Sequence, residues 1–407
     1  MSLIVQKFGG SSVADAHHLF NVAKKITNLY SKGNDIIVVV SAQGDTTDKL
    51  LEMASEINKN PSKREMDILL SAGEQMSISL LAMAIEKMGF PVVSLTGWQA
   101  GIKTNSNYND AKIINISTDR IKAELSKKNI VVIAGFQGIN ENGDITTLGR
   151  GGSDTSAVAI AAAMNADVCK IYTDVDGVYT ADPRIVLAAK KLSSISYDEM
   201  FELSYHGAQV LNDRSIDTAK KYSVEIEVLS SMLDSESGTI VKNIPEKKGN
   251  IISGIAAENN IVKITVTNAK NKKIFVDKIF PEIKSKNIKC DNSLAPIGQM
   301  PLENVIFTVP ENKLNEAVVI IEKYLSDDEN TQIFYDKNKS KISIINLSEN
   351  ININIASIMF ETLFETNIEI EMIACDNARA SVLISSNNMH TALNSIHSKL
   401  FEEDNLL

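Results

Sequence analysis

The first half of the chain alternates short β-branched, apolar runs with longer amphipathic stretches. Five of these runs are apolar on both faces and predict buried strands. They are Leu3–Gln6, Ile36–Ser41, Val92–Leu95, Ile130–Ala134 and Cys169–Thr173. Helical patterns lie between them at His17–Tyr30, Asp48–Ile57, Lys63–Met88, Asn109–Lys127 and Ser153–Met164. This order predicts an α/β fold of right-handed βαβ units, with a mostly parallel sheet covered by helices on both faces.

A change of composition near Gly254 predicts a second region. Glycine becomes scarce there, and the segment repeats itself with one constant shift. Val262–Val266 matches Ile342–Asn346, a shift of 342 − 262 = 80, and the same shift places Lys278–Phe280 on Ile358–Phe360. Each copy predicts a ferredoxin-like βαββαβ unit. We therefore expect a first domain at 1–245, a repeat at 254–330 that shares strands with the C-terminal end, and a repeat at 331–407, with turn-rich linkers at Ser235–Gly238 and Pro245–Asn250.

The charge balance narrows the class of partner. The 407 residues carry a formal net charge of −10, which argues against nucleic acid or an anionic membrane surface as the main partner. We see no apolar run of about 20 residues and no signal peptide, so we expect a cytoplasmic protein without a membrane span. Cys169, Cys290 and Cys375 have no metal-ligand or redox spacing.

A first glycine-rich segment follows the first strand. In Lys7-Phe-Gly-Gly-Ser-Ser12 the two glycines allow close approach of the backbone to a ligand, and the start of the next helix offers free N–H donors. Lys7 adds a positive charge at the same place. The segment lacks the spacing of a Walker loop. It is compatible with a phosphate site, and equally with a tight turn beside a solvated lysine.

A second glycine-rich segment, Gly149–Thr155, opens an alanine-rich helix. Arg150 can hold a carboxylate with two parallel hydrogen bonds, and Gly151 and Gly152 again expose backbone donors. Asp154 has no lysine or arginine after it in the segment, although a simple helix-cap role also fits. Two such segments on one sheet suggest that two anions meet, a nucleotide phosphate and an acidic acceptor.

Three further segments carry polar side chains near predicted strand or helix ends. Ser41–Asp48 is rich in hydroxyl groups, and Glu74 in Ser71–Glu74 could pair with an ammonium group or simply favour the helix dipole. Tyr172–Arg184 follows the fifth strand and offers an aromatic face and an arginine. No Ser–His–Asp or Cys–His set is present in the sequence. A carboxylate acceptor needs none, because it is already a nucleophile near neutral pH.

These motifs resemble, in order, the signature of the aspartate kinases (aspartokinases) of the monofunctional type, which have an amino-acid-kinase domain and two C-terminal ACT domains. The motifs are Lys7–Val13, Val40–Asp48, Ser71–Glu74, Leu148–Thr155 and Tyr172–Arg184. The resemblance covers the whole chain and is strongest up to about Leu211. It implies the reaction ATP + L-aspartate → ADP + 4-phospho-L-aspartate, the entry to lysine, threonine and methionine biosynthesis.

The resemblance also implies roles for individual residues. Lys7, Gly9, Gly10 and Asp154 would be catalytic, with Lys7 stabilising the transferred phosphoryl group and Asp154 organising Lys7. The substrate residues would be Ser41, Thr47, Glu74, Arg150 and Ser153, with Glu74 on the ammonium group and Arg150 on a carboxylate. The nucleotide residues would be Lys7, Gly10, Thr173, Asp174, Tyr179 and Arg184. Mg²⁺ would arrive with ATP, so no dedicated metal ligands are expected.

Two departures from the family pattern are present. Gln209, Asn212 and Asp213 replace the lysine, histidine and proline of a common Gly-Ala-Lys-Val-Leu-His-Pro motif, which puts nucleotide contact at Gln209 in doubt. The repeats carry Asn268–Lys273 and Ser348–Asn352 in place of a Pro-Gly turn. The resemblance implies lysine, or less readily threonine, as an effector at ACT domains of a homodimer or homotetramer. The alternatives are a kinase for another small carboxylate and a non-catalytic amino-acid sensor of the same fold.

Overall fold

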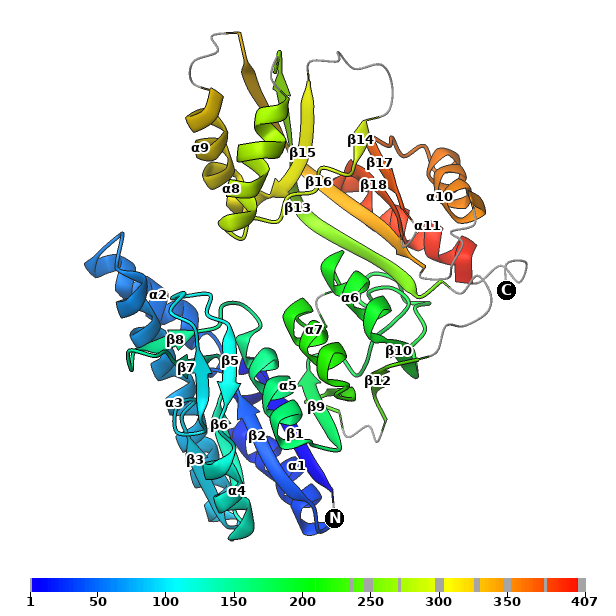
Figure 1. Cartoon of the computed structure of the whole chain (residues 1–407). Coiled ribbons are helices and arrows are strands. Elements are labelled where there is room, and N and C mark those ends of the chain that lie inside the picture. Colours follow the sequence, from blue (N-terminus) through cyan, green and yellow to red (C-terminus); the bar gives the residue numbers. More distant parts are fainter. Residues whose placement is uncertain are drawn as a thin grey trace. The chain divides into compact units, whose positions relative to one another are not determined.

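The computed structural model describes residues 2–208, 210–233, 237–244, 252–269, 272–296, 304–325, 330–346, 353–376 and 379–401. The chain forms two compact units (Figure 1). The first comprises Met1–Val178, Lys191–Phe201 and Gln209–Ile244, and the second comprises Tyr179–Lys190, Glu202–Ala208 and Pro245–Leu407. Two short segments inside the predicted first domain therefore cluster with the repeats. The predicted linker Pro245–Asn250 lies outside the described residues, and the domain boundaries stay a prediction.

An eight-stranded sheet organises the first unit, in the order β10-β12-β11-β9-β1-β2-β6-β3. Its strands are β1 (Leu3–Phe8), β2 (Asp35–Val40), β3 (Val92–Leu95), β6 (Ile130–Ala134), β9 (Val168–Thr173), β10 (Ser194–Ser196), β11 (Ile226–Ser230) and β12 (Thr239–Lys242). From β11 to β3 every neighbouring pair is parallel. The five predicted strands are confirmed to within two residues at either end.

Helices cover the sheet because alternate side chains of its strands are apolar on each face. The helices in this part of the chain are α1 (Ala16–Ser31), α2 (Thr46–Ile57), α3 (Lys63–Lys87), α4 (Asp119–Ser126), α5 (Gly152–Met164), α6 (Tyr197–Tyr205) and α7 (Asp213–Tyr222). Of these, α1, α3, α4 and α5 contact strands of the sheet directly. Apolar residues of α1 and α3 share one buried cluster with β1, β2 and β6. Helix α5 contacts β1, β2 and β9 but adds nothing to that cluster, so it lies on the opposite face.

The predicted helix Asn109–Lys127 is wrong in its first half. Ile113–Ile116 is strand β5, which pairs antiparallel with β4 (Ile102–Thr104). These two strands join β7 (Gln137–Ile139) and β8 (Ile145–Thr147) in a small second sheet. The isoleucines of β5 suit a strand better than a helix, since β-branched side chains fit a pleated surface. Only Asp119–Ser126 is helical.

Helix α3 is long and apolar enough, by length and composition alone, to cross a membrane. It is the one helix of that kind among the described residues. Just over half of its most apolar window is buried inside the unit, where it packs against β3, β6 and β8. The buried face also carries the acidic residues Asp67 and Glu74. This pattern is that of a core helix covered by protein.

The second unit contains one six-stranded sheet, in the order β14-β17-β18-β16-β13-β15. Its strands are β13 (Gly254–Thr267), β14 (Ala295–Pro296), β15 (Val305–Pro310), β16 (Gln332–Ile345), β17 (Met372–Cys375) and β18 (Arg379–Ser385). Its helices are α8 (Phe280–Ser285), α9 (Leu314–Leu325), α10 (Ile353–Glu365) and α11 (Met389–Phe401). The two repeats meet where β13 pairs antiparallel with β16, and each repeat keeps its own apolar cluster.

Candidate active site

The carboxyl ends of four parallel strands bring most of the predicted site residues to one edge of the large sheet. Val40, the last residue of β2, pairs with Phe8 at the end of β1 and with Ala134 at the end of β6. On the other side of β1, Phe8 pairs with Tyr172 of β9. The segments that follow these strands therefore start beside one another. Ligands of parallel sheets bind at such an edge.

The first glycine-rich loop is held by its backbone. Ser41 N–H donates to the Phe8 carbonyl at 3.1 Å, and Gly44 N–H donates to the Gly10 carbonyl at 3.0 Å. A Cβ atom at Gly10 would lie 2.6 Å from the Ala42 carbonyl oxygen, so no larger residue fits without moving that backbone. At Gly9 the nearest atom to such a Cβ is Lys7 Nζ, 3.7 Å away. A side chain would therefore not fit at Gly10, whereas Gly9 has room for a methyl group beside Lys7.

An ion pair joins the two glycine-rich loops. Lys7 Nζ lies 2.6 Å from Asp154 Oδ1, and both side chains are largely buried, with 12% and 13% of their surface exposed. Lys7 belongs to β1, and Asp154 to the first turn of α5, directly after the second loop. Ser153 is buried in the same turn, against the Gly135 backbone that follows β6. The two predicted anion sites thus meet at the same edge of the sheet.

Arg150 stands at the tip of the second loop and is exposed. None of the ion pairs formed by the described residues uses its guanidinium group. Gly151, next to it, has φ 69°, a left-handed conformation that favours glycine. The guanidinium could therefore bind a carboxylate with two hydrogen bonds, and this role stays a prediction.

Glu74 lies in the middle of α3 with 3% of its surface exposed. Its Oε1 accepts a hydrogen bond from Ala42 N–H at 3.0 Å, and its buried Oε2 has no partner among the described residues. Burial raises the pKa of Glu74 to about 7, although the hydrogen bonds from Ala42 and its own backbone oppose that rise. An unpaired buried carboxylate oxygen is costly unless a cation binds it. Glu74 is therefore suited to hold an ammonium group.

The remaining predicted residues of the first unit lie around this edge. Ser41 follows β2 directly, and Thr47 is the second residue of α2. Thr173 ends β9, and its hydroxyl donates to Asp174 Oδ1 at 2.9 Å. These positions agree with the implied roles on the acceptor side and the nucleotide side. The roles themselves stay predictions.

Two predicted nucleotide residues, Tyr179 and Arg184, belong to the second unit. There Arg184 forms an ion pair with Asp182, with Nη2 2.8 Å from Oδ2. The structure does not bring these two residues together with Lys7 in one unit, and their contact with a nucleotide stays a prediction. Gln209 lies outside the described residues.

The sequence interpretation missed several residues that support the second loop. Asp67, fully buried on α3, accepts hydrogen bonds from Thr147 N–H at 2.9 Å, from the Thr147 hydroxyl at 2.6 Å and from Asn109 N–H at 3.0 Å. Burial raises the pKa of Asp67, and the Thr147 hydroxyl opposes that rise. One signal was available: Asp67 precedes Glu74 by seven residues, which places both on one face of the helix.

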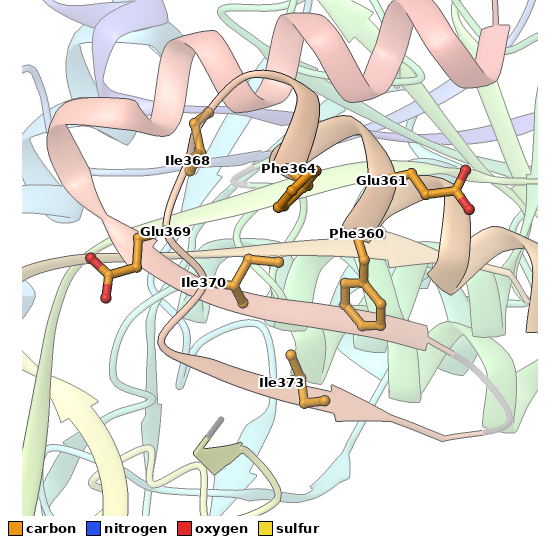
Figure 2. Close-up of a pocket in the computed structure, with 7 residues that line it drawn as sticks. All are labelled: Phe360, Glu361, Phe364, Ile368, Glu369, Ile370 and Ile373. Carbon is orange, nitrogen blue, oxygen red and sulfur yellow. The ribbon is translucent and has the colours of Figure 1, made fainter. Parts of the chain in front are cut away.

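Among the described residues, no group of three or more His, Cys, Asp or Glu side chains is arranged to hold a metal ion. A groove of about 550 Å³ lies in the second unit, between α10 and β17 (Figure 2). Phe360, Phe364 and Ile370 gather at its centre, while the carboxylates of Glu361 and Glu369 point away. Without a cationic group, this groove is not suited to phosphate.

Comparison with known proteins agrees with this geometry. The model of the amino acid kinase family matches residues 2–230, which is more than half of the chain. The aspartokinase of Geobacillus stearothermophilus is 43% identical over 398 residues, covering 98% of this chain and 97% of that protein.

Two solved structures have a similar fold at lower sequence identity. E. coli aspartokinase III in complex with aspartate and ADP has a TM-score of 0.79 at 22% identity, and covers 98% of this chain and 100% of its own. The same enzyme in complex with lysine and aspartate has a TM-score of 0.76 at 22% identity, with coverage of 98% and 99%. From its sequence similarity, which extends over nearly the whole length, the chain belongs to the aspartokinase family, the amino acid kinases that transfer a phosphoryl group to the carboxyl group of aspartate.

Proposed function

We propose that this chain catalyses ATP + L-aspartate → ADP + 4-phospho-L-aspartate at the edge where the two glycine-rich loops meet. The observation that carries the proposal is the ion pair between Lys7 and Asp154, which places a cation from the donor loop beside the acceptor loop. Attack of a carboxylate on the γ-phosphate requires in-line positioning and charge neutralisation, and it needs no general base.

The donor side is assigned to the first loop. Backbone N–H groups near Gly9 and Gly10 would receive phosphate oxygens, and Lys7 would neutralise charge on the transferred group. ATP would bring Mg²⁺ bound to its phosphate oxygens. Most of the other ligands of such a magnesium ion would be water molecules, with few protein side chains among them. Thr173 and Asp174, with Tyr179 and Arg184, are the proposed contacts to the rest of the nucleotide.

The acceptor side is assigned to the second loop and α3. Arg150 would bind the α-carboxylate of aspartate, and Glu74 Oε2 would bind its ammonium group. Ser41, Thr47 and Ser153 would line the space between them. Holding both α-substituents leaves the side-chain carboxylate as the nucleophile, so chain length should distinguish aspartate from glutamate.

Regulation, assembly and location are proposals that rest on the resemblance. We place the protein in the cytoplasm, at the first step of lysine, threonine and methionine biosynthesis. We assign lysine, ahead of threonine, as an effector bound by the repeats of the second unit in a homodimer or homotetramer. E. coli aspartokinase III has been solved with lysine bound, and its similar fold supports this assignment.

The test is to incubate the purified protein with ATP, Mg²⁺ and hydroxylamine, and to measure the hydroxamate that traps an acyl phosphate. We expect hydroxamate from L-aspartate and far less from L-glutamate. A preference for glutamate or another carboxylate would assign a different acceptor. Tight lysine binding without hydroxamate from any acceptor would favour the non-catalytic sensor.

A further inference from the structure

The start of helix α7 lies against the second glycine-rich loop, within the first unit. Asn212 caps this helix, and its side-chain oxygen accepts a hydrogen bond from Arg214 N–H at 3.1 Å. The Nδ2 group of the same side chain donates to the Arg150 carbonyl at 3.3 Å. A Cβ atom at Gly151 would lie 2.3 Å from the Asn212 amide, so the two residues are in close contact. One side chain therefore serves both the helix and the loop.

Arg214 binds the residue that precedes the loop, Leu148. Its Nη1 donates to the Leu148 carbonyl at 3.2 Å, and its Nη2 lies 2.5 Å from Asp110 Oδ1. Asn109, the residue before Asp110, donates its backbone N–H to the Asp67 carboxylate. With these contacts the guanidinium of Arg214 is directed to a backbone carbonyl and to a carboxylate of this chain. It is a support for the loop, and Arg150 is the arginine left for a ligand.

We infer that Asn212 and Arg214 are positioning residues for the loop Gly149–Gly152, and that they set the affinity for the acceptor through Arg150. The inference rests on the proposed function, because it assigns these residues to the acceptor side of that reaction. It also gives a physical role to Asn212, one of the residues that depart from the family motif. A loop held at the carbonyls of residues 148 and 150 keeps the backbone that carries Arg150 in one place. Fixing that backbone before binding lowers the entropy lost when the carboxylate arrives.

The sharpest variant is Asn212→Asp. Its carboxylate keeps an acceptor for Arg214 N–H, so the helix cap is retained. It loses the donor to the Arg150 carbonyl and faces that oxygen with a second acceptor. We expect the KM for aspartate to rise about tenfold, as expected for one lost hydrogen bond, with the KM for ATP changed less than twofold.

Arg214→Gln tests the contacts of Arg214 with the Leu148 carbonyl and Asp110, and Lys220→Gln is its matched control. Lys220 also forms an ion pair from α7, to Asp198 at 2.5 Å, but both partners are exposed and Lys220 belongs to the last turn of the helix. We expect Arg214→Gln to raise the KM for aspartate and Lys220→Gln to leave both KM values unchanged. Equal effects of the two variants would mean that α7 acts only through general stability.

Coupling to Arg150 separates positioning from a merely structural role. In an Arg150→Ala background, Asn212→Asp should add less than twofold to the KM for aspartate, because the residue it positions is gone. Full additivity, or a rise in the KM for ATP alone, would overturn the inference.

Calorimetric binding of aspartate to wild type and Asn212→Asp, without nucleotide, keeps the two proposals distinct. Weaker binding by the variant supports the inference even if the wild type forms no hydroxamate, and that result would refute the proposed function alone. If the wild type forms hydroxamate and both proteins bind aspartate with equal affinity, the inference alone would be refuted.

Discussion

The two glycine-rich loops at the sheet edge are held in place by different means. The first loop, at Gly9 and Gly10, is fixed by backbone hydrogen bonds and by steric fit against Ala42. The second, at Gly149–Gly152, also has a backbone hydrogen bond, from Gly152 N–H to the Gly149 carbonyl, and in addition the carbonyls of residues 150 and 148 accept hydrogen bonds from the side chains of Asn212 and Arg214. A phosphate site needs backbone N–H groups at fixed positions. Where close packing of the backbone fixes them, as at Gly10, only glycine fits. A loop held by side chains can keep its shape while those side chains vary.

The largest effect should come from Lys7→Ala, which removes the cation shared by both loops. We expect kcat to fall about 10²- to 10³-fold, as for loss of one preorganised group that stabilises transition-state charge. The control is Lys170→Met, because Lys170 forms a comparable strand-borne ion pair with Glu227 in the same sheet. Hydroxamate formation should distinguish them, and full activity in Lys7→Ala would remove the assigned role.

Gly10→Ala tests whether steric fit holds the first loop. The added methyl group would meet the Ala42 carbonyl oxygen, so we expect about 1–3 kcal/mol of destabilisation and a kcat lower by up to about 10²-fold. Gly9→Ala is the matched change, since its methyl group has room and the φ of −74° suits alanine. Thermal unfolding should show a loss only for Gly10→Ala. Equal losses would mean that steric fit does not distinguish the two positions.

Glu74→Gln tests the acceptor side from α3, outside both glycine-rich loops, and the amide oxygen keeps an acceptor for Ala42 N–H. Removing the charge opposite the substrate ammonium group should raise the KM for aspartate about tenfold or more at pH 8, with the KM for ATP unchanged. Steady-state kinetics with each substrate varied in turn will show which constant moves. A rise in the KM for ATP would place Glu74 on the donor side instead.

The pH dependence of aspartate binding follows from the same group. Because the pKa of Glu74 is raised to about 7, its carboxylate is lost as pH falls through that value. In wild type the KM for aspartate should rise up to about tenfold for each pH unit below 7, and in Glu74→Gln this rise should be absent. The same steepness in both proteins would trace the dependence to another group.

A smaller effect concerns stability without ligand. Between the ordinary pKa of 4.5 and about 7, the folded protein holds a proton on Glu74 that the unfolded chain has released. Stability should therefore decrease as pH rises through this window, by at most about 3 kcal/mol, and level off above it. Denaturation of wild type and Glu74→Gln across this range will isolate the contribution. A contribution of the opposite sign would mean that Glu74 is ionised and paired.

Much of this edge was predictable from the sequence. The strands have strong local patterns, and parallel order then requires that Lys7, Ser41 and Thr173 lie at the carboxyl ends of neighbouring strands, at one edge of the sheet. The helix predicted at Asn109–Lys127 failed at Ile113–Ile116, because pairing with β4 outweighed the local helical pattern.

The supports of the second loop were not predictable in the same way. Asp67 and Thr147 are 80 residues apart, and Asn212 and Arg150 are 62 apart. No local pattern encodes such contacts. In the sequence Asn212 is only a departure from a motif, and the role that we infer for it rests on the hydrogen bond that its side chain donates. Tyr179 and Arg184 show the same limit, because sequence adjacency to β9 did not place them in the first unit.

The central claim is that the two loops serve one reaction, with Lys7 on the donor and Arg150 on the acceptor. A crystal structure with a non-hydrolysable ATP analogue, Mg²⁺ and aspartate tests it directly. We expect Lys7 Nζ within hydrogen-bond distance of the γ-phosphate and the Arg150 guanidinium on the α-carboxylate of the same complex. Ligands bound at separate places, with Lys7 and Arg150 touching neither, would contradict the account.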